Sequence, residues 1–431
     1  MATATTWVPS TPPNSDFSLA NLPLGIITTR SDPTPRPATA IGMHALDLKL
    51  LSSRLDLPSL LPSIPSLSST LSQPTLNAFA QLGRPAHRAF REFLQDLLST
   101  ETTRPELLRD DAALREEVLV HRTKVMMELP MEVGDYTDFY AGEHHARAVG
   151  VMFRGAENAL QPNYKHLPVG YHGRASSVVV SGTGVHRPVG QILVDGVVVT
   201  AASRKMDFEL ELGCFVGRGS EMGKGVGVDE AEEWVFGYVL LNDWSARDVQ
   251  AWEYVPLGPF NGKNFATTVS GWVVLADALE PYRAEGIENG TELQGYLKEG
   301  RRENMFDISL EVELTTAEGD STIISRTSSK NLLWSFPQMI AHHTLGGCPM
   351  RAGDLLGSGT ISGPRGAGDQ GSLLEMTDNG KKEVLLAGMD ARRFLKDGDT
   401  ITLRGHCGPD GARVGFGDCR GRIYSAAGVS R

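Results

Sequence analysis

The sequence contains few cysteines, and none of them belongs to a paired motif. Only Cys214, Cys348, Cys407 and Cys419 occur among the 431 residues, and no CxxC motif is present. A zinc ribbon or a thiol redox site therefore has no support. Scattered thiols are typical of a reducing compartment, so we expect a cytoplasmic protein. The first residues lack a basic segment followed by an apolar one, and this predicts no secretion signal.

Positive charge and long apolar runs are also scarce. The formal net charge is −11, and no block of like charge stands out. An acidic chain is a poor partner for nucleic acid or for an anionic membrane, so we expect neither. The longest apolar runs, such as 235–241, are too short to span a bilayer. The motifs GxxxxGK[ST] and GxSxG are absent, which leaves a P-loop and a serine hydrolase elbow unsupported.

Glycine, in contrast, is abundant, with 47 residues. Helix interiors disfavour glycine, so this composition favours a β-rich fold with many tight turns. The length suggests two or three domains, and the texture of the sequence changes near residue 129. We therefore expect an N-terminal domain over 1–128 and a C-terminal domain over 129–431, in a mostly β, α+β protein.

The first of these segments shows helical patterns. The stretch 51–74 is rich in Leu, Ser and Pro, which predicts loops and short turns rather than one long helix. Apolar residues at helical spacing after Pro85 predict a helix over 86–99, and a second, polar helix is expected over 105–121. No candidate catalytic residue stands out in this part.

From residue 129 onward, short β-branched runs are cut by Gly and Pro. They predict strands over 178–180, 193–199, 208–216, 235–241, 272–275 and 308–314. A helix is expected over 334–345, with Gly346 and Gly347 as its stop. This segment is therefore predicted to be mostly antiparallel sheet, with functional residues on its loops.

Glu209 and Glu211 are the sharpest local signal. If 206–212 is a strand, side chains alternate between its faces, and Asp207, Glu209 and Glu211 share one face. Neighbouring carboxylates repel each other, so a buried pair requires a cation. A solvated strand face has the same pattern, and both interpretations stay open at this point.

Two further carboxylates could join this pair. Asp243 ends the apolar run 235–241, where either a site residue or the N-cap of a short helix fits. Asp138 lies in an aromatic-rich segment. A hard cation takes oxygen ligands, so both could complete a set with Glu209 and Glu211.

Several basic and aromatic residues are candidates for substrate contact. Adjacent His144 and His145 cannot both face one point on regular structure, so at most one of them is catalytic. Arg154 and Tyr171 lie close to glycines, and Lys263 lies on a tight loop. Arg binds carboxylates with two parallel hydrogen bonds, which suits recognition of an acidic substrate, although ordinary turn residues have the same pattern.

Together these segments resemble the fumarylacetoacetase family, from about Asp16 to Ala427. The motifs that carry the resemblance are long and uninterrupted. They are DYTDFY (135–140), HLPVGYHGRASS (166–177), ELE (209–211), NDWSARD (242–248), WEYVPLGPF (252–260), GTISG (359–363) and GHC (405–407). One departure is the loop 364–370, which is slightly longer than the family pattern and leaves the register of Glu375 open.

The resemblance implies a fold and an activity. The fold is a small N-terminal SH3-like β-barrel domain with helices, followed by a large C-terminal β-sandwich roll, in a homodimer. The activity is hydrolysis of a carbon–carbon bond in 4-fumarylacetoacetate to fumarate and acetoacetate, the last step of tyrosine and phenylalanine catabolism. The implied cofactor is Mg²⁺ or Ca²⁺.

The resemblance also implies roles for individual residues. His145, rather than His144, corresponds to the general base, and Glu375 orients it. The implied metal site comprises Asp138, Glu209, Glu211, Asp243, Lys263 and Thr267. Developing negative charge is stabilised by Arg247, Gln250 and Lys263. The implied substrate contacts are Tyr140, Arg154, Tyr171, Gln250, Tyr254 and Thr360.

Chemistry agrees with these roles. Cleavage of a carbon–carbon bond expels a carbanion, which needs its charge delocalised and stabilised by a cation and nearby donors. A neutral His deprotonates water well near pH 7 when a carboxylate fixes its tautomer.

Two other functions are compatible with parts of the sequence. An acylpyruvase or an oxaloacetate decarboxylase of the same superfamily shares the Glu-x-Glu and downstream Asp set, but usually lacks the N-terminal domain and the segment 135–140. A non-catalytic binding protein is disfavoured by the intact carboxylates, His145 and Lys263.

Overall fold

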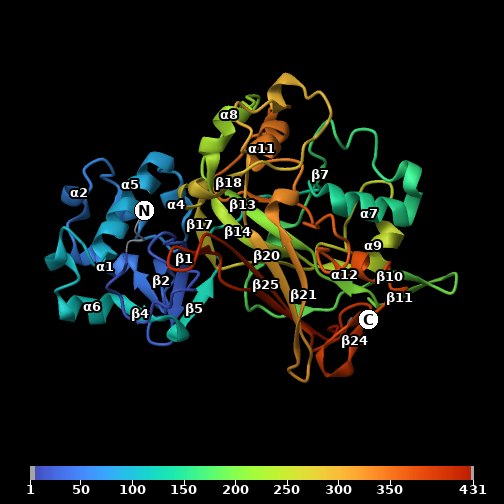
Figure 1. Cartoon of the computed structure of the whole chain (residues 1–431), viewed down its shortest axis with the longest axis horizontal. Helices are drawn as coiled ribbons and strands as arrows, with labels where there is room; N and C mark the ends of the chain where they lie inside the picture. The colour runs from blue at the N-terminus through green and yellow to red at the C-terminus, as the bar shows by residue number, and fades with distance from the viewer. Residues whose placement is uncertain (1–4, 429–431) are drawn as a thin grey trace.

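A computed structural model describes residues 5–428, and its fold is mixed α/β and β-rich. Two sheets of different size lie against each other, and helices cover their margins (Figure 1). No helix within the described residues combines the length and apolar character needed to cross a membrane.

The first part of the chain, blue in Figure 1, combines short strands with a layer of helices. Its strands are β1 (Leu24–Thr29), β2 (Arg36–Ile41), β3 (His44–Asp47), β4 (Leu119–His121) and β5 (Val125–Glu128). Its helices are α1 (Leu48–Arg54), α2 (Leu57–Leu60), α3 (Leu67–Thr70), α4 (Asn77–Ala80), α5 (Arg84–Leu98) and α6 (Ala112–Val118). The expected helix over 86–99 is confirmed as α5, with Pro85 in its first turn. The stretch 51–74 contains short helices and turns, as predicted.

The polar helix predicted over 105–121 is wrong. A 3-10 turn over Pro105–Leu107 is followed by α6 and then by β4. The Asp111 carboxylate accepts the backbone N–H of Leu114 and starts a new helix there. Leu119 to His121 then pair with β3, since Val120 is β-branched and suits a strand better than a helix.

The larger sheet runs through both parts of the chain. Its strand order is β4-β3-β2-β1-β17-β14-β13-β22-β6-β7, with β5 on β1, β16 on β14 and β8 on β16. Its remaining strands are β6 (Tyr136–Phe139), β7 (Gly170–His172), β8 (Val178–Val180), β13 (Leu210–Val216), β14 (Val235–Asp243), β16 (Thr267–Val269), β17 (Trp272–Leu275) and β22 (Leu355–Gly357). Strand β1 joins the two parts, because Leu24 pairs with Val273 and Gly25 with Trp272.

The smaller sheet packs across β14 and shares its core. Its strands are β9 (Val185–His186), β20 (Ser309–Thr315), β21 (Ser321–Ser328), β25 (Thr400–Cys407), β26 (Val414–Gly415) and β27 (Cys419–Tyr424). A Cβ atom on Gly405 would lie 2.9 Å from Leu240, and one on Gly421 would lie 2.4 Å from Trp244. Glycine at these two positions therefore allows the sheets to approach closely.

A long hairpin replaces the single strand predicted over 193–199. Strand β10 (Val189–Val194) turns at Asp195 and Gly196, which have φ of 50° and 80°, and returns as β11 (Val197–Ala202). Asp-Gly favours the tight turn that reverses two strands, and this signal was missed. The hairpin projects from the rest of the molecule (Figure 1, right).

Helices frame one end of the larger sheet. They are α7 (Glu143–Arg154), α9 (Arg247–Glu253), α11 (Phe336–Thr344) and α12 (Leu373–Met376). The expected helix over 334–345 is confirmed as α11, where Ser335 and Gln338 form a capping box. Smaller elements are α8 (Val228–Ala231), α10 (Ala276–Leu279), β12 (Met206–Asp207), β15 (Ser245–Ala246), β18 (Arg283–Ala284), β19 (Met305–Phe306), β23 (Val384–Leu385) and β24 (Ala391–Arg392).

Candidate active site

Four buried carboxylates meet where strands of the larger sheet end. They are Asp138 in β6, Glu209 just before β13, Glu211 in β13 and Asp243 at the end of β14. One oxygen of each lies within 4.8 Å of an oxygen of every other. The sheet brings them together, because β13 pairs with both β14 and β22, and β22 pairs with β6. We call this group the carboxylate cluster.

Two buried cations neutralise one half of the carboxylate cluster. Lys263 Nζ donates to Asp243 at 2.7 Å and also to Glu209. Arg247 Nη1 lies 2.8 Å from the other oxygen of Glu209. Burial raises the pKa of Glu209, but Lys263 and Arg247 outweigh it and lower the pKa to about 2. Glu209 is therefore ionised at neutral pH.

The other half of the carboxylate cluster lacks such partners. Burial, together with the other carboxylates, raises the pKa of Asp138 and Glu211. Asp138 Oδ1 and Glu211 Oε1 accept no hydrogen bond from any described residue. The second oxygen of Glu211 accepts the Gly359 N–H at 3.0 Å. Buried oxygens without donors require a proton or a cation, so this half is suited to a metal ion.

A glycine keeps the cluster open. A Cβ atom on Gly357 would lie 2.5 Å from Asp138 Oδ1, 3.0 Å from Glu211 Oε2 and 3.2 Å from the Tyr136 hydroxyl. That hydroxyl is also buried without a hydrogen-bond partner among the described residues. Two buried polar atoms without partners, Asp138 Oδ1 and the Tyr136 hydroxyl, therefore lie next to Gly357, where any side chain would crowd them.

Asp207 does not belong to the carboxylate cluster, and the continuous strand over 206–212 from which a shared face was expected is not formed. The strand is interrupted, because β12 ends at Asp207 and β13 begins at Leu210. The Asp207 carboxylate instead accepts Arg247 Nε at 2.8 Å.

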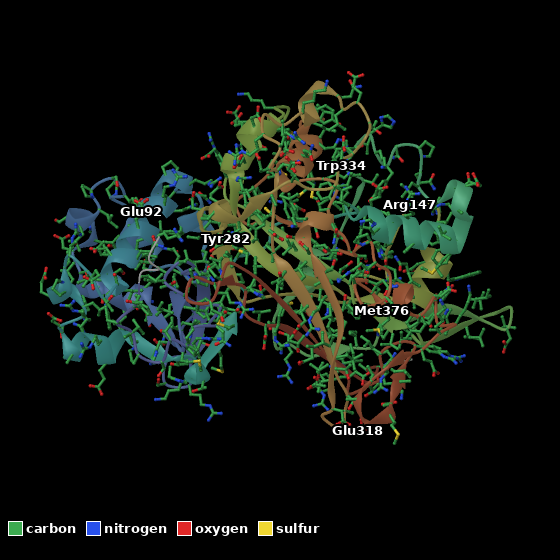
Figure 2. The ribbon with its side chains drawn as sticks, in the orientation of Figure 1. Glu92, Arg147, Tyr282, Glu318, Trp334 and Met376 are labelled. Carbon is green, nitrogen blue, oxygen red and sulfur yellow. The ribbon has the colours of Figure 1, made fainter. Side chains whose placement is uncertain are left out.

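His145 and Glu375 form a buried pair beside the cluster. His145, near the start of α7, lies 2.6 Å through Nδ1 from Glu375 Oε2 in α12. Helices α7 and α12 are in contact, and Figure 2 labels Arg147 on α7 and Met376 at the end of α12. His144 is not part of this pair.

Hydroxyl groups complete the surroundings of Glu375. Ser362 and Ser372 each donate to Glu375 Oε2 at 2.9 Å. Burial raises the pKa of Glu375, but His145 and these hydroxyls outweigh it, so the net pKa is lowered. Glu375 is therefore ionised and accepts the Nδ1–H of His145.

Other residues selected from the sequence surround the same point. Tyr171 donates to Asp243 at 2.9 Å, and Thr267 donates to it at 3.1 Å. The Tyr140 ring contacts the His145 ring edge to face, with 5.5 Å between centroids. Gln250 accepts Arg247 Nη1 at 3.2 Å, and Thr360 is buried next to Gly359.

Two candidates lie farther out. The Arg154 guanidinium, at the end of α7, donates to the carbonyl oxygens of Asn158 and Ala159 at 3.0 and 2.7 Å. Tyr254, which follows α9, has 44% of its surface exposed. Neither side chain hydrogen-bonds to the carboxylate cluster within the described residues.

Sequence reasoning gave no role to Ser362, Ser372 and Tyr136, and it missed the contacts of Asp207. Ser372 had a recognisable signal, because Ser-x-x-Glu is the pattern of a helix capping box and it ends at Glu375 here. The others carry no local signal, since the groups around them are distant in sequence.

Hard oxygen donors beside His145 and ionised Glu375 are typical of enzymes in which a divalent cation and a general base act together, as in metal-dependent hydrolases. Comparison with known proteins narrows this class. Residues 136–424 match the family model described as fumarylacetoacetate (FAA) hydrolase C-terminal, and residues 20–130 match fumarylacetoacetase N-terminal. The chain therefore belongs to the fumarylacetoacetate hydrolase family.

Individual relatives are similar over nearly their whole length. A fumarylacetoacetase of Aspergillus fumigatus is 57% identical over 422 residues, covering 96% of this chain and 97% of the relative. One of Emericella nidulans is 56% identical over 419 residues, covering 96% of each. The crystal structure of a putative HpcE protein from Mycobacterium smegmatis has a TM-score of 0.53 at 18% identity, covering 93% of this chain and 99% of that one. That likeness concerns the fold alone.

Proposed function

We propose that the protein catalyses the hydrolysis of 4-fumarylacetoacetate to fumarate and acetoacetate, the last step of tyrosine and phenylalanine catabolism. Relatives of 56–57% identity over 96% of the chain are fumarylacetoacetases. The structural observation that carries the proposal is the buried carboxylate cluster beside the His145–Glu375 pair. The substrate is a small dicarboxylate diketone.

Asp138, Glu209, Glu211 and Asp243 would hold the metal ion, Mg²⁺ or Ca²⁺. The donor set is all oxygen, which both ions prefer, and two of its oxygens have no other partner among the described residues. When bound, such an ion supplies Lewis acidity toward the ketone oxygens of the substrate. Lys263 and Thr267 belong to the same site through their hydrogen bonds to Asp243.

His145 acts as the general base. The Nδ1–H of His145 donates to ionised Glu375, which fixes the orientation of the ring and leaves Nε2 as the atom that accepts a proton from water. His145 takes a proton from water as the water oxygen bonds to the carbonyl carbon of the fumaryl group. The bond between this carbon and the neighbouring methylene then breaks, and its electron pair leaves with acetoacetate as an enolate. A proton finally returns to the enolate carbon.

Arg247, Lys263 and Gln250 stabilise the negative charge that develops. Burial lowers the pKa of Arg247 and Lys263, but the neighbouring carboxylates outweigh it and raise both values, so both side chains stay protonated. Gln250 accepts from Arg247 through Oε1, which leaves its amide N–H groups free to donate to substrate. Fixed donors in a buried site stabilise such charge strongly.

Tyr140, Tyr171 and Thr360 contact the substrate close to the reacting carbons, and Arg154 and Tyr254 contact it farther out. The substrate has a carboxylate at each end, and Arg and Tyr side chains donate well to carboxylates. The position of Tyr140 against His145 and of Tyr171 against Asp243 supports the inner contacts.

The protein acts as a homodimer. Apolar side chains are exposed on the β10–β11 hairpin and on the segment that includes the end of α9, and Trp252 Nε1 joins the two by donating to Gln191. These exposed residues are Leu193, Val197, Val198, Trp252, Val255, Leu257 and Phe260. Several exposed apolar side chains on neighbouring elements support an interface between chains.

We also propose the domain division 1–128 and 129–431, with an SH3-like barrel in the first domain, a β-sandwich roll in the second, and a cytoplasmic location. Five short strands over 24–128 support the SH3-like barrel of the first domain, although no pairing between β4 and β5 closes it within the described residues. Two facing sheets support the roll. The four cysteines are unpaired, as in a reducing compartment.

An activity assay tests this proposal. Purified protein is given fumarylacetoacetate with Mg²⁺, with Ca²⁺ or with a strong chelator, and the loss of diketone ultraviolet absorbance is followed. We expect metal-dependent loss with fumarate and acetoacetate as products, and no turnover by His145→Ala that still binds metal. Folded, metal-loaded protein that leaves the diketone intact would exclude the proposed function.

A further inference from the structure

Asp207 is a fully buried carboxylate that the proposed mechanism does not use. It ends β12 and has none of its surface exposed. Its two oxygens accept four hydrogen bonds. Oδ2 accepts Arg247 Nε at 2.8 Å and the Leu374 N–H at 2.9 Å. Oδ1 accepts the Leu373 N–H at 2.7 Å and the Phe208 N–H at 2.8 Å.

These bonds connect two parts of the site that are distant in sequence. Arg247 is one of the proposed charge-stabilising groups, and its Nη1 also lies 2.8 Å from Glu209. Leu373 and Leu374 begin α12, the helix that carries Glu375. One carboxylate therefore holds both the guanidinium and the helix that orients the base.

Helix α12 needs this support. It has only four residues, Leu373–Met376, and so short a helix has little stability of its own in water. The first N–H groups of a helix have no partner within it. Here Asp207 accepts two of them, and Ser372 accepts the N–H of Glu375 at 3.4 Å.

We propose that Asp207 is a positioning residue that fixes Arg247 relative to the His145–Glu375 pair. The inference rests on the proposed function, since it assigns Asp207 to the same reaction. The Asp207 side chain acts through its neighbours and does not reach the substrate. A displacement of about 1 Å between groups that act together lowers a rate by about 100-fold.

Asp207→Asn tests this role because it keeps the size of the side chain. The amide presents one oxygen and one NH₂ group to four N–H donors. If the NH₂ group replaces Oδ2, Arg247 loses its acceptor; if it replaces Oδ1, Leu373 loses its acceptor. One of the two connections is therefore broken in either orientation.

The matched control is Asp399→Asn. Asp399 is equally buried and accepts Arg392 Nε at 2.8 Å and Nη2 at 2.9 Å. It also accepts the Lys396 N–H at 2.8 Å, so, like Asp207, it is a buried carboxylate that accepts from a guanidinium and from the backbone, with three hydrogen bonds in place of four. The two variants lose similar local contacts, and only one of them touches the proposed site.

The experiment measures kcat, KM, Mg²⁺ affinity by calorimetry and thermal stability for the full chain. We expect Asp207→Asn to lower kcat by about 10- to 100-fold while KM and Mg²⁺ affinity change by less than about threefold. Asp399→Asn should lower the melting temperature comparably and leave kcat unchanged. Wild-type kcat in folded Asp207→Asn would overturn the inference, and so would equal kcat losses in both variants.

A second readout does not depend on turnover. The short hydrogen bond between His145 Nδ1 and Glu375 should give a low-field proton signal in the NMR spectrum, assigned by its loss in Glu375→Gln. We expect this signal to shift in Asp207→Asn and to stay in place in Asp399→Asn. An unshifted signal in Asp207→Asn overturns the inference, whether or not the wild type hydrolyses fumarylacetoacetate. A wild type that does not hydrolyse fumarylacetoacetate excludes only the proposed function. Should Asp207→Asn not fold, Asp207→Glu, which keeps the charge and displaces the carboxylate, should show the same pattern.

Discussion

Lys263→Met should destabilise the metal-free protein much more than the metal-loaded protein. Lys263 Nζ is buried and donates to Glu209 and Asp243. Within residues 5–428, Lys263 and Arg247 are the two cationic side chains that form ion pairs with the carboxylate cluster. Methionine has a similar length but no charge, so the variant leaves buried carboxylates with a single cationic neighbour.

The size of the effect follows from the burial of the pair. Removing one partner of a buried ion pair costs roughly 3–5 kcal/mol, because the remaining charge stays desolvated. A surface pair contributes only about 0–1 kcal/mol. In a chelator we therefore expect Lys263→Met to lower the free energy of unfolding by about 3–5 kcal/mol. Saturating Mg²⁺ stabilises any folded form that binds it, by about 2.7 kcal/mol at 100 times Kd. The stabilisation should be larger in Lys263→Met, because the Lys263 ammonium no longer competes with the ion for the carboxylates.

Denaturant unfolding, followed by tryptophan fluorescence, measures the free energy of unfolding with chelator and with Mg²⁺. Trp244 and Trp334 report on unfolding because both are buried. The control is Lys330→Met, which removes a half-exposed ion pair to Asp307 of 3.0 Å and should cost at most about 1 kcal/mol. Equal losses in the two variants would refute the reasoning, and so would a Lys263→Met protein that Mg²⁺ does not stabilise.

Three further outcomes are expected. Burial raises the pKa of Glu280, but hydrogen bonds from two arginines outweigh it and lower the pKa from 4.5 to about 2. The stabilisation that Glu280 contributes is therefore present above pH 4.5 and is lost as pH falls toward 2. Over this pH range, the loss of unfolding free energy measured in urea titrations should be smaller in Glu280→Gln, by about 1 kcal/mol after solvent screening. Gly357→Ala should weaken Mg²⁺ binding about 10- to 100-fold in calorimetry, because its Cβ would crowd the cluster; unchanged affinity would contradict the placement of the ion. Ser372→Ala removes a donor to Glu375 and should raise the pKa of Glu375, so the stability that ionised Glu375 contributes should be lost at higher pH on acidification in urea titrations; an unmoved loss would argue against this contact.

Local patterns predicted much of the fold. The helix after Pro85, the strand at 272–275 and the helix that ends before Gly346 all lie where the sequence places them. In each case a proline, a capping residue or a β-branched run determines the local conformation. Patterns with two possible outcomes were less informative: the apolar run 193–199 hides a reversal at Asp195-Gly196.

The candidate site could be predicted only in part. Carboxylates at strand ends and the family resemblance pointed to Asp138, Glu209, Glu211 and Asp243, and the structure brings them together. The environment of each could not be predicted, because it comes from segments far apart in sequence. Alternation along a continuous strand would put Asp207 on one face with Glu209 and Glu211, whereas the strand breaks after Asp207, and its carboxylate bonds to Arg247 and to the start of α12.

The pairing of β1 with β17 also limits how the chain can be shortened. Strand β17 lies between β1 and β14, and β14 carries Asp243. A fragment that began near residue 129 would therefore lack β1 and present an open strand edge, with backbone groups free to pair with other molecules. Such an edge promotes aggregation, so the first part of the chain also protects the catalytic sheet from self-association.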